Sequence, residues 1–447
     1  MTEKKSKTKE TLVIQGGTPL YGSVRVGGAK NASYKLMIAS LLGSGENRLL
    51  NLSRIADVAM TIEIIRSLGA QALYKGERAL FIDPQGLNKW ELDEKYGIKS
   101  RASTMFIPVL LAKFGKARVP QPGGDKIGVR PLERHWAGLE AMGATIQQKE
   151  GWIEAKASKG LHGTNYRFDK NTHTGTETLL MAAVMAKGTT VLENAAEEPE
   201  IDDLISLLNK MGARIRRRSF RTIEIEGVEK LSGAIHRVMP DRNEMVSYAC
   251  AAIASKGDVI VENAQPELLQ AFLRKLDEIG AGYEAGDYGM RFFYKGPLRP
   301  TDVETQIHPG FMTDWQPLWA TLISHAQGDS IIHETVMQNR FQYVDQLRQM
   351  GAKIEDVATI VQDPENFYNF NLEDKKDSDV HAIRISGPTQ FIGQEMKVHD
   401  LRAGATLILA ALSAKGETVL HNVNQIDRGY EKLPEKLVSM GAKIKRV

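Results

Sequence analysis

The hydrophobic positions of this 447-residue chain follow one pattern that recurs along its length. In each copy, apolar residues spaced as on one face of a helix end at a glycine, and a short run with the alternation of a strand follows. The pattern appears six times, about 70 to 90 residues apart, with its glycine at Gly69, Gly143, Gly212, Gly280, Gly351 and Gly441. Six copies in one order are hard to obtain by chance, so we predict a repeat protein.

A second landmark lies about 23 to 28 residues before each of these glycines, again in register. It is an apolar helix, then a glycine, then a β-rich run, as in AAVMAKGTTVLENA and AAIASKGDVIVENA. Each repeat is therefore predicted to be helix, strand, helix, strand, with a further strand or hairpin before the next copy. Six such units could stack as a solenoid or close as two groups of three, and hydropathy does not choose between these arrangements.

Length, charge and cysteine content indicate the general class of protein. The length favours two domains of about 200 residues, and the formal net charge of +3 does not by itself suggest a nucleic-acid or membrane partner. The single cysteine, Cys250, lies in an apolar run and is predicted to be a core residue. Residues 1–10 are charged and lack the apolar core of a signal peptide, so we expect a disordered leader. No uncharged apolar stretch of about 18 residues occurs, and we expect a cytoplasmic protein.

Nine short motifs carry a resemblance to a known family. The sequence VGGAKNA at 26–32 resembles the signature of the UDP-N-acetylglucosamine 1-carboxyvinyltransferases, the enolpyruvyl transferases that open peptidoglycan synthesis. The other matches follow in the family's order almost to the end of the chain: GGDKIGVRP at 123–131, ENAAEEPEI ending at Ile201, MPDR at 239–242, NAQP at 263–266, FMTD at 311–314, QNRF at 338–341, DLRA at 400–403 and IDRGY at 426–430.

The resemblance implies the fold. Members of this family have two inside-out α/β barrel-like domains, each of three repeats, with a cleft between them. Carried onto this chain, residues 30–239 form the first domain, and residues 11–29 together with 240–447 form the second. The two hinges are then expected near Lys30 and at Met239-Pro240, where proline restricts the backbone.

The resemblance also implies a reaction, in which the enolpyruvyl group of phosphoenolpyruvate passes to the 3-hydroxyl of UDP-N-acetylglucosamine and phosphate is released. Both substrates are anionic, and guanidinium groups match phosphate and carboxylate geometry. The family needs no cofactor, and the sequence lacks a metal-ligand cluster, a P-loop and a dinucleotide fingerprint. We therefore expect small-molecule substrates and no cofactor, metal, nucleic acid or membrane partner; the oligomeric state stays open.

Matching positions supply the expected chemistry. Phosphoenolpyruvate is assigned to Lys30, Asn31, Arg130, Arg402 and Arg428. Asp314 is the expected base at the sugar hydroxyl. The nucleotide sugar is assigned to Asn31, Asp314 and a further group of positions: Arg101, Arg130, Pro131, Leu132, Glu133, Arg134, Thr172, His173, Thr174, Val336 and Arg340. His135 is expected either to touch phosphate or to be an ordinary helix histidine.

Three positions depart from the family pattern. Asp125 stands where most members carry the cysteine that serves as general acid or in product release. A carboxylate is a poor nucleophile toward the epoxide fosfomycin, which alkylates that thiolate, so we predict insensitivity to fosfomycin. Ala56 and Ala59 replace charged residues around the retained Asp57, which is expected to weaken the polar network beside Lys30.

Two alternatives remain open at this point. A shikimate-pathway enolpyruvyl transferase shares the fold but takes a small anionic ring, and GGDKIGVRP, RPLER and FMTDWQ favour the UDP-sugar enzyme. A catalytically silent paralogue that binds a nucleotide sugar is suggested by the two alanines. Retention of Lys30, Asp125, Asp314 and Arg402, besides Arg130 and Arg428, argues against it.

Overall fold

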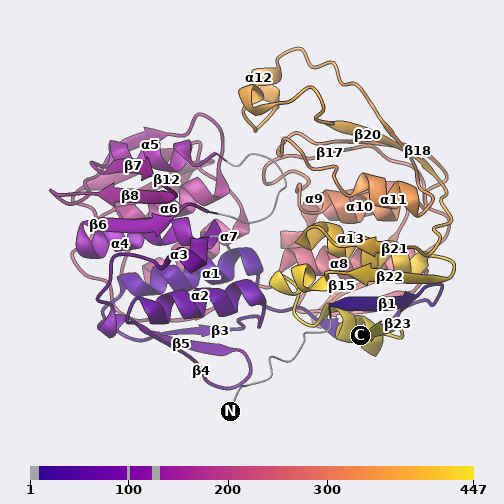
Figure 1. Cartoon of the computed structure of the whole chain (residues 1–447), viewed down its shortest axis with the longest axis horizontal. Coiled ribbons are helices and arrows are strands. Elements are labelled where there is room, and N and C mark those ends of the chain that lie inside the picture. The colour runs from indigo at the N-terminus through magenta and orange to yellow at the C-terminus, as the bar shows by residue number, and fades with distance from the viewer. Residues whose placement is uncertain (1–9, 98–100, 123–130) are drawn as a thin grey trace. The chain divides into compact units, whose positions relative to one another are not determined.

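The computed structural model describes residues 10–97, 101–122 and 131–447, and of Arg101 it describes the backbone alone. Two compact units divide the chain (Figure 1). The inserted unit holds the described residues between Gly27 and Asp241, drawn from indigo to magenta. The flanking unit holds residues 10–26 together with Arg242–Val447. The chain thus leaves and re-enters the flanking unit at residues 26–27 and 241–242.

The inserted unit is built from short strands and longer helices. Its strands are β3 (Asn47–Leu50), β4 (Gln71–Tyr74), β5 (Ala79–Asp83), β6 (Lys116–Pro120), β7 (Thr145–Lys149), β8 (Trp152–Lys156), β9 (Asn165–Arg167), β10 (Thr189–Glu193), β11 (Arg214–Ser219), β12 (Thr222–Glu226) and β13 (Ile235–Arg237). Its helices are α1 (Lys30–Ala39), α2 (Ala56–Ser67), α3 (Glu94–Gly97), α4 (Ile107–Phe114), α5 (Glu133–Ala141), α6 (His173–Ala183) and α7 (Pro199–Lys210), with 3₁₀ turns η1 (Ser40–Leu42), η2 (Pro84–Gly86) and η3 (Arg101–Phe106).

The flanking unit repeats this plan. Its strands are β1 (Thr11–Gln15), β2 (Tyr21–Arg25), β14 (Asp258–Glu262), β15 (Gly282–Gly286), β16 (Gly289–Phe293), β17 (Val303–Glu304), β18 (Gly328–His333), β19 (Lys353–Asp356), β20 (Ala382–Gly387), β21 (Glu395–Lys397), β22 (Glu417–His421) and β23 (Lys443–Arg446). Its helices are α8 (Arg242–Ala254), α9 (Gln270–Ile279), α10 (Gln316–Ile323), α11 (Val344–Gln349), α12 (Pro364–Phe367), α13 (Leu401–Ser413) and α14 (Leu433–Ser439), with η4 (Pro266–Leu268), η5 (Leu372–Asp374) and η6 (Val423–Arg428).

One sheet design accounts for all six sheets of the described residues. A parallel edge strand is followed by three antiparallel strands in β13-β3-β5-β4, β9-β10-β12-β11, β2-β14-β16-β15, β17-β18-β20-β19 and β21-β22-β1-β23. The sixth sheet, β6-β8-β7, has the three antiparallel strands, and Glu91 forms an isolated parallel bridge to Arg118 at the place of the edge strand. Each unit therefore contains three sheets, one per predicted repeat.

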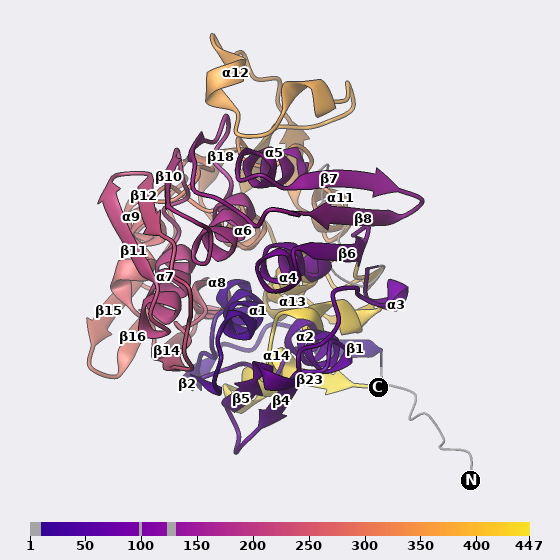
Figure 2. The same ribbon diagram turned by 90° about the vertical axis from the view of Figure 1, so that its left-hand side faces the viewer.

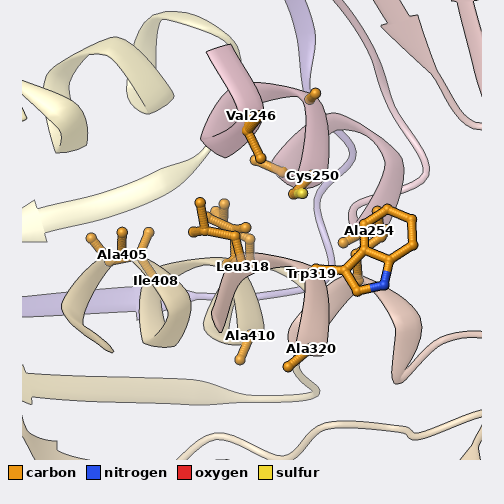
Figure 3. Close-up of a cluster of buried hydrophobic side chains, with 14 of the residues drawn as sticks. Val246, Cys250, Ala254, Leu318, Trp319, Ala320, Ala405, Ile408 and Ala410 are labelled. Carbon is orange, nitrogen blue, oxygen red and sulfur yellow. The ribbon is translucent and has the colours of Figure 1, made fainter. Parts of the chain in front are cut away.

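Helices lie inside the sheets in both units. Every residue of α8 is buried, and α8, α10 and α13 pack on one another. Figure 3 shows part of this core, where Leu318 and Trp319 of α10 lie among side chains of α8 and α13. Figure 2 faces the inserted unit and shows α1, α4 and α6 nearly end-on. A helix that is apolar all round belongs in a core. The prediction of inside-out α/β domains with three repeats each is confirmed.

The glycine that marks each predicted repeat has a conformational reason. All six have positive φ, between 76° and 105°: Gly69, Gly143, Gly212, Gly280, Gly351 and Gly441. This left-handed conformation ends a helix and favours glycine because a Cβ atom is strained there. The next strand then starts within two or three residues.

The β19–β20 connection of the flanking unit is much longer than its counterparts. Residues 357–381 carry α12 and η5 between the two paired strands, and they form the orange excursion around the α12 label in Figure 1. Tyr368 and Phe370 of this excursion are buried, with their ring centroids 4.8 Å apart. The excursion therefore has a small aromatic core of its own.

Candidate functional site

The residues predicted to bind substrate stand at the starts of helices. Lys30 and Asn31 open α1, while His173 and Thr174 open α6. Arg402 is the second residue of α13. Pro131 and Leu132 directly precede α5, which Glu133 and Arg134 begin. Exposed backbone N–H groups and the helix dipole make such positions favourable for anions.

Lys30 is held between two carboxylates of the inserted unit. Its ammonium group lies 3.1 Å from Asp57 Oδ2, in the first turn of α2. Its backbone N–H donates to Asp241 Oδ2 at 2.8 Å. Asp241, the last residue of the inserted unit in the sequence, therefore caps α1 near the beginning of that unit. Ala56 and Ala59 are exposed and leave the Lys30–Asp57 pair in place. The cation is thus oriented before any substrate arrives.

The start of α6 is also tied down by hydrogen bonds. Thr172 caps the helix by accepting from the Gly175 N–H at 3.2 Å. Thr174 Oγ1 lies 2.9 Å from Nε2 of His135, which is buried, so His135 supports the loop from α5. Arg134 donates to Asp169 Oδ1 at 3.0 Å.

His173 faces a carboxylate inside the inserted unit. Its Nε2 atom lies 3.3 Å from Glu177 Oε1, one helical turn along α6. Burial alone would lower the pKa of the imidazole, but the Glu177 carboxylate outweighs it and the pKa is raised above its ordinary value. About a fifth of the side chain, 22%, remains exposed. The Glu177 carboxylate therefore favours the protonated form of His173 at the helix start.

In the flanking unit, Asp314 joins two arginines. Its Oδ1 atom lies 3.1 Å from Arg340 Nη2 and its Oδ2 atom 3.2 Å from Arg402 Nη2. Both guanidinium groups are buried, and Asp314 is partly exposed just before α10. Asp400 caps α13 by accepting from the N–H groups of Arg402 and Ala403 at 2.8 and 3.0 Å. The structure thus brings together three of the predicted residues in one hydrogen-bonded cluster.

Tyr430 completes this cluster from the other side of Arg402. Its hydroxyl accepts from Arg402 Nη1 at 3.0 Å and lies 2.8 Å from Ser247 Oγ. Ser247 in turn donates to the Asn243 carbonyl at 2.7 Å. Tyr430 belongs to the IDRGY motif, but no sequence signal indicates that its hydroxyl contacts Arg402.

The segment after β18 is organised by a buried carboxylate. Glu334 accepts from the N–H groups of Val336 and Met337, each at 2.9 Å, and from the Thr313 hydroxyl at 2.9 Å. Burial raises the pKa of Glu334, although these donors oppose the shift. Glu334 therefore links predicted residue Val336 to the residue before Asp314.

Other predicted residues are less fully described. Asp125 and Arg130 lie outside the described residues, and the Arg101 backbone begins η3. Arg428 is the last residue of η6 and is partly buried. Among the described residues, no group of three or more His, Cys, Asp or Glu side chains is placed to hold a metal ion. Across those same residues, no helix has both the length and the apolar character to cross a membrane.

Comparison with known proteins gives near full-length matches. A family model described as EPSP synthase (3-phosphoshikimate 1-carboxyvinyltransferase) matches residues 14–437. The UDP-N-acetylglucosamine 1-carboxyvinyltransferase of Desulforapulum autotrophicum is 41% identical over 438 residues, which cover 98% of this chain and 100% of that protein. The protein of the same name from Koribacter versatilis is also 41% identical, over 98% of this chain and 96% of its own.

Solved structures share the fold. The enolpyruvyl transferase NikO from Streptomyces tendae superposes with a TM-score of 0.83 at 25% identity, over 98% of both chains. An EPSP synthase from Acinetobacter baumannii gives a TM-score of 0.72 at 17% identity, over 98% of this chain and 99% of that one. At the lower identity the likeness concerns the fold alone.

Proposed function

Because this chain belongs to the EPSP synthase family of enolpyruvyl transferases, we propose that it transfers the enolpyruvyl group of phosphoenolpyruvate to the 3-hydroxyl of UDP-N-acetylglucosamine, the opening step of peptidoglycan synthesis. The observation that carries the proposal is the Asp314 carboxylate, just before α10, which pairs with Arg340 of the segment after β18 and with Arg402 at the start of α13. The relatives at 41% identity carry the name of this activity.

The reaction requires three proton transfers and two bond changes at C2 of phosphoenolpyruvate. Attack of the sugar oxygen on C2 forms a C–O bond, while the double-bond electrons take up a proton at C3 and the hydroxyl proton passes to a base. C3 then loses a proton, the double bond returns, and phosphate leaves with the electrons of its bond to C2. The net products are the enolpyruvyl ether and phosphate.

Residues are proposed for the transfer of the hydroxyl proton and for the binding of phosphoenolpyruvate. Asp314 accepts the hydroxyl proton, and Arg402 binds an anionic group of phosphoenolpyruvate together with Lys30, Arg130 and Arg428. Arg402 is paired with Asp314 in the described structure. When the substrate anion replaces Asp314 at this guanidinium, the Asp314 carboxylate becomes available to the sugar hydroxyl. Substrate binding thereby prepares the base, since a carboxylate that shares fewer cations is a stronger proton acceptor.

The nucleotide sugar is proposed to lie against the other predicted positions. His173 and Thr174 at the start of α6 present a cation and a hydroxyl suited to a diphosphate. Glu133 and the preceding Pro131 and Leu132 supply the proposed uracil contacts. Val336, held by Glu334, is the proposed neighbour of the N-acetyl side, and Asn31 the neighbour of the sugar or the reaction intermediate.

A phosphate-release assay with phosphoenolpyruvate tests the proposal. Wild type should release phosphate with UDP-N-acetylglucosamine but not with shikimate 3-phosphate, and release with neither acceptor would refute the proposal. Asp314→Asn and Arg402→Lys should each lower kcat/KM by at least about 100-fold, the scale of general-base loss or of a misplaced buried cation. Arg384→Lys, at a partly exposed arginine of β20, is the matched control and should keep wild-type activity.

We further propose that Asp125 acts as the general acid and makes the enzyme insensitive to fosfomycin. Prolonged incubation of the wild type with fosfomycin should leave the rate of phosphate release unchanged. Asp125→Cys should acquire time-dependent inactivation, because a thiolate can open the epoxide. Time-dependent inactivation of the wild type would overturn this part of the proposal.

A further inference from the structure

Two opposite charges lie inside apolar helices of the inserted unit. Lys35 belongs to α1 and Glu177 to α6, and their side chains are 2% and 0% exposed. The Lys35 ammonium lies 3.0 Å from Glu177 Oε2. Removing two ions from water is costly, and a well-packed apolar pair is often as stable. The pair is therefore poor evidence for stability and calls for another explanation.

The pair connects the first turns of the two helices. Lys35 Nζ also donates to the Asn31 carbonyl at 2.5 Å, one turn back along α1. Glu177 Oε1 also meets His173 Nε2 at 3.3 Å, one turn back along α6. A continuous row of Asn31, Lys35, Glu177 and His173 thus spans two helix starts that hold predicted substrate-binding residues.

The charges around His173 show which group sets its ionisation. Three charged side chains face it, namely Glu177 on its own helix, Lys35 from α1 and Glu198 from the start of α7. His135 of α5 reaches the same turn through Thr174. Burial and the Lys35 ammonium both disfavour the charged imidazole, whereas Glu177 favours it most strongly. Glu177 therefore decides the charge, and Lys35 holds Glu177 in place.

We propose that Lys35 and Glu177 are positioning residues that hold His173 as a cationic hydrogen-bond donor for the diphosphate of the nucleotide sugar. Glu177 engages Nε2, which leaves Nδ1 to donate to a phosphate oxygen. Lys35 fixes the Asn31 backbone by the same contact network, so the sugar side and the diphosphate side are set together. This inference rests on the proposed function, since it assigns the ligand of His173 from it.

The first test needs no ligand. The histidines are labelled with ¹³C, the His173 signal is identified with a His173→Asn variant, and its titration is followed by NMR in the full chain. Glu177→Gln keeps the shape of the side chain and removes its charge, so His173 should titrate at lower pH than in wild type. Glu140→Gln, an exposed glutamate of α5, is the matched control and should leave the titration unchanged. An unchanged His173 titration in Glu177→Gln would overturn the inference.

The second test measures binding of UDP-N-acetylglucosamine by calorimetry at pH 5.5 and at a pH between the His173 titration midpoints of wild type and variant found in the first test. At that second pH, Glu177→Gln should bind several-fold more weakly than wild type, because its imidazole has lost the charge that strengthens a hydrogen bond to phosphate. If Glu177→Gln fails to fold, Lys35→Met/Glu177→Gln removes both charges; its affinity should fall at the second pH and recover at pH 5.5. Wild-type affinity at the second pH in the variant tested would overturn the inference.

The two tests also separate this inference from the proposed function. A wild type that binds no UDP-N-acetylglucosamine at either pH would refute the proposed function and the diphosphate assignment together. The His173 titration would still report whether Glu177 sets the charge. A wild type that binds the nucleotide sugar, with variants that bind it equally well, would refute the inference alone.

Discussion

Replacing Tyr430 with phenylalanine tests whether the Tyr430 hydroxyl holds Arg402 in place, because the change removes only that hydroxyl. Ser247 has a single hydroxyl proton, which it donates to the Asn243 carbonyl. The Tyr430 hydroxyl must therefore donate its own proton to Ser247 and accept one from Arg402. Tyr430→Phe removes both bonds and keeps the aromatic ring, whose centroid lies 5.4 Å from the Arg402 guanidinium carbon.

The expected magnitude follows from the two bonds. The bond to Ser247 is neutral and worth about 1 kcal/mol, and the bond from the guanidinium is worth about 1.5 to 3 kcal/mol. Ser247 keeps its bond to Asn243, but Arg402 loses an acceptor while buried. We expect the free energy of unfolding of the flanking unit to fall by about 2 to 4 kcal/mol, and KM for phosphoenolpyruvate to rise with a smaller change in KM for the nucleotide sugar.

Hydrogen exchange of peptides from α8 and α13 measures this change, because it reports the flanking unit separately from the inserted one. Tyr288→Phe is the control, since Tyr288 is exposed and belongs to the same unit. A loss below about 0.5 kcal/mol, the range of ordinary surface substitutions, together with an unchanged KM for phosphoenolpyruvate, would refute the argument that Tyr430 orients Arg402.

Three further predictions follow from single residues. The thiol of Cys250 is buried and burial raises its pKa, so native protein should resist iodoacetamide and unfolded protein should be fully alkylated; rapid alkylation of native protein would contradict this. Asp379 accepts from Gln338 Nε2 at 2.6 Å, and Gln338 lies between the predicted nucleotide-sugar residues Val336 and Arg340. Asp379→Asn should therefore speed hydrogen exchange around residue 338 and raise KM for the nucleotide sugar several-fold. Glu373→Gln, at an exposed glutamate, should do neither. Burial lowers the pKa of His381 to about 4, so the unfolded chain binds the extra proton below about pH 6.5. Stability should fall by about 2 kcal/mol between pH 7 and pH 5, and His381→Asn should remove that part of the loss in a denaturant titration.

The repeat could be predicted from sequence because its signals are local. The residue that ends each of these helices has a left-handed backbone, which favours glycine, as at Gly212 with φ 105°. A single glycine in the sequence therefore marks the helix end. The closing of the β21-β22-β1-β23 sheet has no such local signal. There β1 lies between β22 and β23, so the first strand of the chain pairs with two of its last. Hydropathy marks β1 as a strand but not its partners.

The candidate site likewise has a part that could be predicted from sequence and a part that could not. Its principal residues were assigned through the resemblance, and the structure describes where Asp314 and Arg402 meet. The supporting contacts could not be predicted, because each joins positions far apart in the chain. Lys35 and Glu177 did leave a trace in the sequence, since Lys35 directly precedes the apolar run at 36–39 and Glu177 lies two residues before the apolar run at 179–183. Two charges of opposite sign beside apolar runs of core helices favour a buried pair, but they do not indicate which residues that pair orients.

The sheet design gives a physical reason why predicted site residues of both units lie at the starts of helices. In five repeats the parallel edge strand leads directly into a core helix, as β2 into α1, β9 into α6, β13 into α8, β17 into α10 and β21 into α13. These connections carry Lys30, His173, Asp241, Asp314 and Arg402 respectively. Each core helix therefore begins at a loop that the sheet holds in place, where the helix dipole favours anions.

The position at a helix start also explains how the same kind of loop can carry either a carboxylate or a cation. A carboxylate at a helix start is stabilised by the helix, as Asp241 is when it accepts from the Lys30 N–H at 2.8 Å. A cation there is opposed by the helix and needs a carboxylate partner, which Asp57 gives Lys30 and Asp314 gives Arg402. Because of this pairing, a cation can stand at a helix start, where the backbone also favours anions. Under the proposed function, a substrate phosphate would take the place of the carboxylate at the guanidinium or ammonium group, so the cation would keep an anionic partner throughout.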